Sequence, residues 1–454
     1  MPEVPVALAA VSVLCRTENG SLEVFWARRA PSLSFLGGFW SFPGGRAEPG
    51  DASLEATAAR ELEEETGLVI EPTPGRYQLA GRTVTPAWAS VRFDATYYLV
   101  EAPPGARPDV TRSGGELVES EWIEPTRALE LWSTGERLTS PVVVAALEAL
   151  VAGWDGAAAR LRDAADAIAR TDLVRAWDLV PGLGMTMLRS PTIPPATHTN
   201  CFLVGNQEVI VVDPGSPYPE EQAALDQVLD RLEGEGRRIR EIWITHHHID
   251  HVAGVDHLVR RLRLPVAAHP LTAELLAGRV AVDRTIADGE TVLFPAAGGR
   301  PERRLRAVFT PGHTPGHHAF LEETTGYVLA GDMVAGIGTV VVDPDEGDMI
   351  AYLASLARLK DQAPRALLPA HGPVISDPAR KLDEYTRHRL WRESRVVEEL
   401  SRAGAVTARE LTPRVYDDVP QAVHALAERS LLAHLAKLVT EGRVLVDDGR
   451  YRLP

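Results

Sequence analysis

The segment Thr245–Gly254 places three histidines and an aspartate of metal-ligand type within six residues, directly after the apolar run Ile239–Ile244. The ligand-type residues are His246, His248, Asp250 and His251. A strand that runs into a turn can direct all four side chains toward one point. Imidazole and carboxylate together suit zinc and similar divalent metals. A chain with only two cysteines has few of the thiolates that structural zinc prefers, so this spacing indicates a catalytic site.

Further motifs place a ligand-type residue at the end of an apolar strand, mostly beside glycine. Glycine allows the backbone to turn sharply around a buried ion. These residues are His313 in Thr310–His317 (TPGHTPGH), Asp332 after Gly331, His371 before Gly372 and, upstream, Asp213 after Val209–Val212. We therefore expect residues distant in sequence to complete one metal site.

The order of these motifs resembles that of the metallo-β-lactamase superfamily, over about 200 residues and with all five signature elements in place. The resemblance implies two Zn²⁺ or other divalent metals, with Asp213 as a buried residue that orients the ligand loop. The implied ligands are His246, His248 and His313 for one metal, Asp250, His251 and His371 for the other, and Asp332 between them. Two such metals generate hydroxide from water near neutral pH, and Asp250 is placed to orient that water or relay its proton.

The remaining histidines near these motifs have other expected roles. We interpret His247 as a non-ligand that points away from its neighbours. His317 is expected to support the site, and the role of His318 stays open. His198 either lines the mouth of the site or is an ordinary surface histidine.

A second group of carboxylates lies on an expected helix, Leu54–Thr66. Glu61, Glu64 and Glu65 are spaced i, i+3 and i+4, so they project from one helix face. Three like charges on one stripe are costly unless a cation neutralises them, and ligands that are all oxygen indicate Mg²⁺ or Mn²⁺ bridging a diphosphate. A solvated acidic helix would explain the carboxylates but not the preceding loop Phe42–Gly45.

The segment Gly44–Leu68 resembles the Nudix box, and the first ~150 residues fit a Nudix domain. Asp51 stands where the usual box has glutamate, and one extra residue precedes Arg60, while the three glutamates of the helix are intact. The resemblance implies attack of a metal-activated water on a diphosphate, with Glu64 in a catalytic role. Similar features, including Glu116–Pro125 (ELVESEWIEP), are found in coenzyme A diphosphatases of the Nudix class.

The elements that must position these residues define an α/β multidomain chain. We expect a Nudix α/β/α sandwich over residues 1–154, a helical linker over 155–174, a metallo-β-lactamase αββα sandwich over 175–379 and a winged-helix tail over 380–454. Strands are expected at Val6–Cys15, Leu22–Ala27, Tyr77–Val84, Ala95–Val100, Leu117–Ile123, Cys201–Val204, Val209–Val212, Ile239–Ile244, Leu305–Thr310 and Tyr327–Ala330. Helices are expected at Leu54–Thr66, Pro141–Ala152, Asp155–Arg170, Glu220–Leu232 and Met349–Lys360.

The tail combines a helix with a hairpin. Arg443–Leu453 alternates around Asp448-Gly449, a good hairpin turn. The predicted apolar helix face consists of Leu426, Leu431, Leu432, Leu435 and Leu438. A winged helix after the last ligand histidine resembles the lactamase-β-like endoribonucleases, which implies single-stranded RNA as a partner and makes Arg389, Arg392 and Arg395 candidate phosphate contacts. The alternative is a solvated, salt-bridged face, because these arginines alternate with Glu393, Glu398 and Glu399.

Composition narrows the classes of function. The net charge of −16 argues against non-specific affinity for nucleic acid. No apolar run approaches 18 residues, so we expect no membrane span. Val4–Cys15 has neither a basic start nor a cleavage site and is expected to be a first strand, with Cys15 and Cys201 as reduced core residues. A cytoplasmic enzyme is the default expectation.

Three hypotheses follow for the function. The first is a two-headed hydrolase, in which a Nudix diphosphatase is joined to a binuclear metallo-β-lactamase-fold hydrolase. The second is a ribonuclease with a nucleotide-sensing Nudix module. The third is an acyl-coenzyme A thioesterase joined to a diphosphatase. The corresponding substrates are a small-molecule diphosphate, a thioester or single-stranded RNA.

Overall fold

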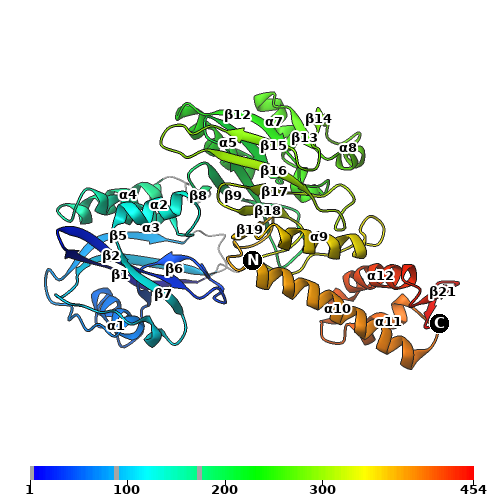
Figure 1. The fold of residues 1–454 in the computed structure, drawn as a ribbon, viewed down its shortest axis with the longest axis horizontal. Helices are drawn as coiled ribbons and strands as arrows, with labels where there is room; N and C mark the ends of the chain where they lie inside the picture. The colour runs from blue at the N-terminus through cyan, green and yellow to red at the C-terminus, as the bar shows by residue number, and fades with distance from the viewer. Residues whose placement is uncertain (1–4, 86–90, 171–175) are drawn as a thin grey trace. The chain divides into compact units, whose positions relative to one another are not determined.

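The computed structural model describes residues 5–85, 91–170 and 176–454 (Figure 1). The chain divides into two compact units. The first comprises Met1–Thr186 with Ala297–Pro301, and the second comprises Met187–Ala296 with Glu302–Pro454. Among the described helices, none combines the length and the apolar composition needed to cross a membrane.

A mixed sheet forms the centre of the first unit. Its strands run in the order β3-β2-β1-β6-β5, with β4 beside β1 and β7 beside β2. The long β1 pairs parallel with β6 and antiparallel with β2. The strand bounds are β1 Val6–Glu18, β2 Ser21–Arg29, β3 Trp40–Ser41, β4 Gly44–Arg46, β5 Tyr77–Val84, β6 Arg92–Glu101 and β7 Leu117–Ile123.

Helices cover both faces of this sheet, because side chains along β1 alternate between two cores. Ala10 and Leu14 belong to the core that contains Leu62 of α1. Val13 belongs to the core that contains Leu147 of α3. The predicted α/β/α sandwich is therefore confirmed. The helices are α1 Leu54–Thr66, α2 Pro125–Ser133, α3 Pro141–Val151 and α4 Ala157–Arg170.

Helix α4 is part of the core of the first unit and not a free linker. Ala157 and Leu161 are buried in the same cluster as Val13 and Trp26. The Ala/Arg/Asp-rich composition of Asp155–Arg170, which suggested a linker, thus belongs to a helix with one face packed in the core. Residues 171–174 of the predicted linker lie outside the described residues, and the domain boundaries at 154, 174 and 379 stay predictions.

The second unit contains two sheets that pack face to face. One runs β14-β13-β12-β11-β10, and the other runs β15-β16-β17-β18-β19. In the first unit, β8 forms an antiparallel hairpin with the start of β9, a strand that continues into the second unit. Trp243 of β12 meets Phe320 of β17 with ring centroids 5.0 Å apart, which places side chains of the two sheets in one core. The strand bounds are β8 Ala176–Val180, β9 Leu183–Arg189, β10 His198–Val204, β11 Glu208–Val212, β12 Arg238–Trp243, β13 Val266–Ala268, β14 Arg284–Thr285, β15 Thr291–Phe294, β16 Arg303–Phe309, β17 His318–Glu322, β18 Tyr327–Gly331 and β19 Ala366–Pro369.

Helices lie outside this pair of sheets and complete the predicted αββα layers. Helix α9 buries Tyr352 and Leu356 against Leu321 and Val328 of the second sheet. It begins at Asp348, whose side chain accepts hydrogen bonds from Ile350 N and Ala351 N. The helices are α5 Pro219–Gly234, α6 Ile249–Val252, α7 Val255–Leu262, α8 Pro270–Leu276 and α9 Met349–Asp361.

The C-terminal part of the second unit is a winged helix, as predicted. Helix α10, orange in Figure 1, leads into α11, α12 and a small sheet in the order β20-β22-β21. Asp448 and Gly449 make the hairpin turn with φ of 46° and 70°. Of the predicted leucine face, Leu431, Leu435 and Leu438 are buried, while Leu426 and Leu432 are only partly so. The bounds are α10 Pro378–Ala403, β20 Val406–Thr407, α11 Ala408–Val415, α12 His424–Thr440, β21 Leu445–Asp447 and β22 Arg450–Arg452.

Candidate functional site

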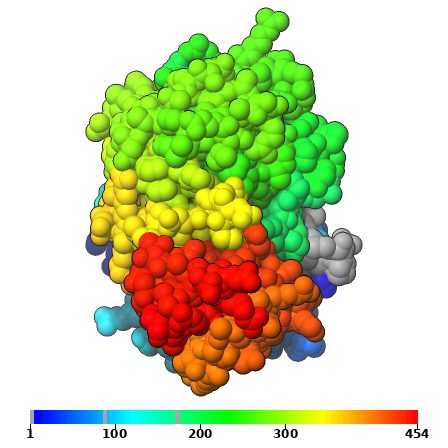
Figure 2. Space-filling view, turned by 90° about the vertical axis from the view of Figure 1, so that its right-hand side faces the viewer, coloured from blue at the N-terminus to red at the C-terminus, as the bar shows by residue number. Residues whose placement is uncertain are grey.

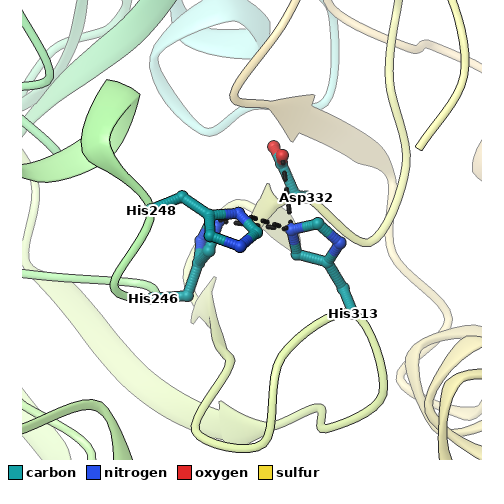
Figure 3. Close-up of side chains that lie close together, drawn as sticks. All are labelled: His246, His248, His313 and Asp332. Carbon is teal, nitrogen blue, oxygen red and sulfur yellow. Dashed lines mark hydrogen bonds and ion pairs between the residues drawn. The ribbon is translucent and has the colours of Figure 1, made fainter. Parts of the chain in front are cut away.

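Three imidazole nitrogens converge just beyond the end of β12 (Figure 3). His248 Nδ1 lies 3.0 Å from His246 Nε2 and 3.1 Å from His313 Nε2, and the two Nε2 atoms are 3.3 Å apart. Asp332 Oδ2 approaches His313 Nε2 at 3.6 Å. Three ring nitrogens that face one another offer more lone pairs than protons, and a divalent cation satisfies such an arrangement. These four residues fit one metal ion.

A second group of ligand atoms adjoins the first. His371 Nε2 lies 3.4 Å from Asp250 Oδ2 and 3.4 Å from Asp332 Oδ1, and His251 Nε2 lies 3.5 Å from the same Asp332 oxygen. His251 Nε2 and Asp332 Oδ1 are buried and, within the described part of the chain, lack a hydrogen-bond partner. Because unsatisfied buried polar atoms are costly, these residues fit a second cation, with Asp332 between the two groups.

Asp213 orients the His251 ring from the side opposite the ligand group. Its carboxylate accepts hydrogen bonds from Thr245 N at 2.8 Å, Thr245 Oγ1 at 2.6 Å and His251 Nδ1 at 2.8 Å. A carboxylate can only accept, so His251 carries its proton on Nδ1 and presents the Nε2 lone pair to the ligand group. Asp213 therefore has the position that the sequence resemblance implies.

His317 supports Asp332 and does not point its lone pair at a metal. Asp332 N donates to His317 Nε2 at 3.1 Å, so the proton of His317 is on Nδ1, which lies 2.8 Å from Thr310 Oγ1. Gly331 has a φ of +50°, and a Cβ there would meet His317 Nε2 at 2.4 Å. The glycine before Asp332 thus permits close approach of the backbone to this ring. The neighbouring His318 is buried among rings and contributes no ligand atom to either group.

Strand β10 positions His371. His371 Nδ1 donates to the carbonyl of His198 at 2.9 Å, which leaves Nε2 facing the ligand group. Asn200 Nδ2 donates to the carbonyls of Pro369 and Gly372 at 2.8 and 2.9 Å and so holds the loop on either side of His371. His198 therefore contributes through its backbone, which its ring chemistry could not have indicated.

Glu346 is a site residue that sequence reasoning missed. Its Oε1 lies 2.7 Å from His248 Nε2, and its Oε2 lies 2.8 Å from His247 Nε2. His247 is thus a buried partner of Glu346 and lies outside these two ligand groups, but with His248 and Glu346 it forms a third compact group that could hold an ion. Its assignment as a non-ligand stays a prediction. The available signal was the acidic turn Asp343–Asp348 (DPDEGD), which precedes α9 and contains no histidine.

The electrostatics of the two ligand groups differ. Burial, reinforced by the neighbouring histidines, holds the pKa of His313 at about 4 and the pKa of His246 well below its usual value, so both rings are neutral and can offer lone pairs. Burial also opposes the charge on His371, yet Asp332 and Asp250 raise its pKa to about 10. The second ligand group, in which Asp250 and Asp332 lie beside His371, therefore attracts positive charge. A metal ion would supply this charge in place of protons.

The first unit places the carboxylates of α1 beside strand β4. Glu65 is 6% exposed and accepts a hydrogen bond from Gly44 N at 2.9 Å, and burial raises its pKa to about 8. Glu61 lies against Gly45, where a Cβ would meet Glu61 Oε1 at 2.5 Å. Gly45 thus lets β4 approach the acidic face of α1, while Gly44 lets the same strand approach Ala10 and Val11 of β1. Glu64 is exposed at the edge of this face.

Arg60 neutralises part of the acidic face. Its guanidinium lies 3.1 Å from Asp51 Oδ1, 3.0 Å from Glu61 Oε1 and 2.9 Å from Glu64 Oε2. Asp51 therefore anchors Arg60. In the described residues Glu61, Glu64 and Glu65 do not form a compact ligand group like those of the second unit, and their role as metal ligands stays a prediction.

The three arginines of α10 that were candidate phosphate contacts bind other groups of the protein. Arg389 and Arg392 are buried, and each donates to a backbone carbonyl. Arg395 pairs with an aspartate at 2.9 Å. Glu393 is also buried and lies 2.6 Å from Lys437 Nζ. The predicted phosphate contacts at these arginines are not supported, and the alternative of a solvated face is wrong for Arg389, Arg392 and Glu393.

Comparison with protein families matches three parts of the chain. Residues 194–371 match the metallo-beta-lactamase superfamily, residues 7–141 match the NUDIX domain, and residues 407–451 match the beta-lactamase associated winged helix domain. All seven candidate ligands of the second unit lie within the first of these ranges.

Comparison with individual proteins also relates this chain to metallo-beta-lactamase-like proteins. The Beta-lactamase-like protein 2 homolog of Caenorhabditis elegans is 32% identical over 252 residues, which is 54% of this chain and 80% of that protein. The atrochrysone carboxyl ACP thioesterase of Aspergillus chevalieri is 32% identical over 256 residues, 54% of this chain and 77% of that protein. A beta-lactamase domain protein from Burkholderia ambifaria shares the fold, with a TM-score of 0.52, 22% identity and coverage of 62% of this chain and 93% of that one. The chain therefore belongs to the metallo-beta-lactamase superfamily, as a metal-dependent hydrolase that also carries a NUDIX domain and a beta-lactamase associated winged helix.

Proposed function

We propose that the second unit hydrolyses a carboxylic thioester, with two divalent metals, zinc as the first candidate, held by seven side chains. One metal would be held by His246, His248 and His313, the other by Asp250, His251 and His371, with Asp332 shared. The surroundings of these ligands favour a neutral, apolar substrate over a phosphodiester.

The first argument is the charge around the ligands. Their ion pairs join them to one another, to Asp213 or to Glu346, and over the described ranges none involves a lysine or an arginine. Transfer at phosphorus is ordinarily assisted by cationic side chains that offset the charge of the substrate. A thioester carbonyl is uncharged and needs no such group.

The second argument, which carries the proposal, is an apolar rim beside the ligands. Ile193, Ile249 and Ile337 are 53%, 53% and 36% exposed. Ile249 stands between two ligands of the loop after β12, and Ile193 follows a threonine whose hydroxyl lies 3.4 Å from His371 Nε2. The backbone N of Ile337 is 2.5 Å from the Cβ position of the glycine after His371. Exposed aliphatic side chains grouped at a polar site are suited to an acyl chain.

The side chains of the site have separable tasks in such a reaction. Bound divalent metals would supply hydroxide near neutral pH and polarise the carbonyl oxygen. The hydrogen bond from His371 and the nearby His251 hold the pKa of Asp250 below its usual range despite burial, so its carboxylate is ionised and can accept a proton from the attacking water. Asp213 keeps the His251 ring fixed while this happens.

The name of one relative agrees with this reading, since the Aspergillus chevalieri protein is a thioesterase. The test is a substrate panel of acyl-coenzyme A thioesters of increasing chain length, single-stranded RNA and a chromogenic phosphodiester. We expect thiol release from the thioesters, its loss in His248→Ala, and a weaker preference for long chains in Ile193→Ser. Cleavage of RNA without thioester hydrolysis would refute the proposal.

For the first unit we propose hydrolysis of a diphosphate linkage with Mg²⁺ or Mn²⁺ bound by Glu61, Glu64 and Glu65. The observation that carries this is the buried carboxylate of Glu65, whose pKa of about 8 shows how poorly its charge is stabilised without a cation. A panel of coenzyme A and nucleoside diphosphate-linked compounds tests it. Absence of Mg²⁺- or Mn²⁺-dependent phosphate ester products from every compound would contradict the proposal.

A further inference from the structure

The segment of residues 339–347, here the 339–347 loop, contacts two candidate ligands on the side away from the metals. His313 Nδ1 donates to the carbonyl of Val341 at 2.8 Å, and His248 Nε2 lies 2.7 Å from Glu346 Oε1. The other nitrogens of these rings, His313 Nε2 and His248 Nδ1, face each other at 3.1 Å in the ligand group. The loop therefore determines which nitrogen carries the proton and which offers a lone pair.

Two arginines of the tail hold this loop. Arg429 of α12 pairs with Asp343, with Nε 2.8 Å from Oδ2, and its Nη2 contacts both Asp343 and Asp345. Arg389 of α10 is buried and donates to the carbonyl of Val340 at 2.5 Å. Paired contacts between a guanidinium and a carboxylate fix orientation as well as distance. Two helices of the tail thus hold the loop at two points.

The apolar side of the loop belongs to the same core as the tail. Val340 and Val342 are buried in one cluster with Tyr352 of α9, Leu382 of α10 and Ala433 of α12. The space-filling view shows the red C-terminal segment directly against the yellow segment that contains α9 (Figure 2). Close packing of this kind leaves the loop little freedom to shift independently of the tail.

The arginine and the lysine of α12 pair with acidic side chains of the protein itself. Arg429 binds the loop, and Lys437 is 9% exposed and pairs with Glu393 and Glu441. A winged helix that reads nucleic acid needs free cations on this helix for phosphates and bases. The contacts of α12 therefore favour a role within the protein.

We propose that the winged-helix tail is a positioning part of the metal centre. Arg389 and Arg429 hold the 339–347 loop, and Glu346 and the carbonyl of Val341 in that loop orient His248 and His313. Loss of such an outer hydrogen bond typically lowers metal affinity 10–100-fold. This role does not depend on which substrate the second unit hydrolyses.

The test measures zinc bound per chain in full-length protein equilibrated with graded concentrations of a competing chelator. Glu346→Ala removes the contact with His248, and Arg429→Ala removes the hold on the loop. We expect each to weaken zinc binding about 10–100-fold. The matched control is Arg402→Ala. Arg402 is an exposed tail arginine whose ion pairs, among the residues that the structure describes, are with neighbouring glutamates of α10. The zinc affinity of this variant should equal that of the unchanged protein.

A double variant, in which Glu346 and Arg429 are both replaced by alanine, separates coupling between these two residues from a general loss of structure. If Arg429 acts through Glu346, the double variant should bind zinc about as weakly as Glu346→Ala alone, and Arg429→Lys should recover part of the loss. Thermal unfolding identifies variants that no longer fold. Unchanged zinc affinity in both folded single variants would overturn the proposal. Should Arg429→Ala not fold, Asp343→Asn decides, since it weakens the same contact between the tail and the loop from the side of the loop.

Discussion

Replacement of Asp213 by asparagine should weaken one of the two proposed metal sites through a change of tautomer. In the native protein the Asp213 carboxylate accepts the Nδ1 proton of His251 at 2.8 Å. Asparagine has the same shape, and its Oδ1 can still accept from Thr245 N. Its amide group, however, would donate to His251 Nδ1. The proton of His251 would then move to Nε2, the nitrogen that should bind metal.

The size of the effect follows from the contacts that are lost. Outer hydrogen bonds to ligand histidines contribute about 10–100-fold to metal affinity, or roughly 1.4–2.7 kcal/mol. Asp213 is 2% exposed, so solvent cannot replace the bond. We expect an affinity loss near the upper limit for the metal bound by Asp250, His251 and His371, and a smaller loss for the other metal. Because the fold keeps its shape, the melting temperature should fall only slightly.

The assay is zinc per chain after dialysis against a competing chelator, with Asp226→Asn as the control. Asp226 pairs with His257 at 2.9 Å in the same unit but lies outside the ligand groups. The control should retain two zinc ions under conditions in which Asp213→Asn retains one. Equal retention by Asp213→Asn and the control would refute the reasoning about the tautomer.

Three further predictions concern the two units and the tail. Glu64→Gln should abolish diphosphate hydrolysis and leave thioester hydrolysis intact, and His248→Ala should do the reverse; parallel loss of both activities would contradict independent sites. Gly45→Ala should lower diphosphate hydrolysis at least 10-fold, since its Cβ would occupy the space of the Glu61 carboxylate; full activity would contradict this. Burial lowers the pKa of His434 to about 3, so the unfolded chain binds this proton more tightly and stability falls as pH drops. Local stability of α12, measured by hydrogen exchange, should fall by ~2 kcal/mol from pH 7 to 5 and not in His434→Leu.

Most secondary structure could be predicted from the sequence because local signals agree with the final packing. Helix α1 begins after Ser53, whose hydroxyl accepts from Ala56 N, and ends at Gly67 with a left-handed φ of 72°. The hairpin at Asp448-Gly449 followed from the same kind of local chemistry. Helix α4 was predicted as a helix, but its burial in the core of the first unit depends on contacts that no local pattern specifies.

The candidate ligand residues were recognisable because each stands in a motif that follows a strand. Their supporting contacts were not. Glu346 lies in an acidic turn without any ligand motif, and only the tertiary fold brings it to His248. The arginines of α10 looked like a charged surface in sequence, although Arg389 is buried against the loop before α9 and Arg392 is buried against the end of α11. Burial of a charge depends on partners distant in the chain, so alternating charges in sequence cannot reveal it.

The most direct test is a crystal structure of zinc-loaded protein with anomalous data at the zinc edge. Two anomalous peaks should appear in the second unit. One should lie among His246, His248 and His313 and the other among Asp250, His251 and His371, with Asp332 in contact with both. A zinc-loaded crystal with no peak among these side chains, or with its metal between His247 and Glu346 instead, would contradict the assignment of the hydrolytic centre.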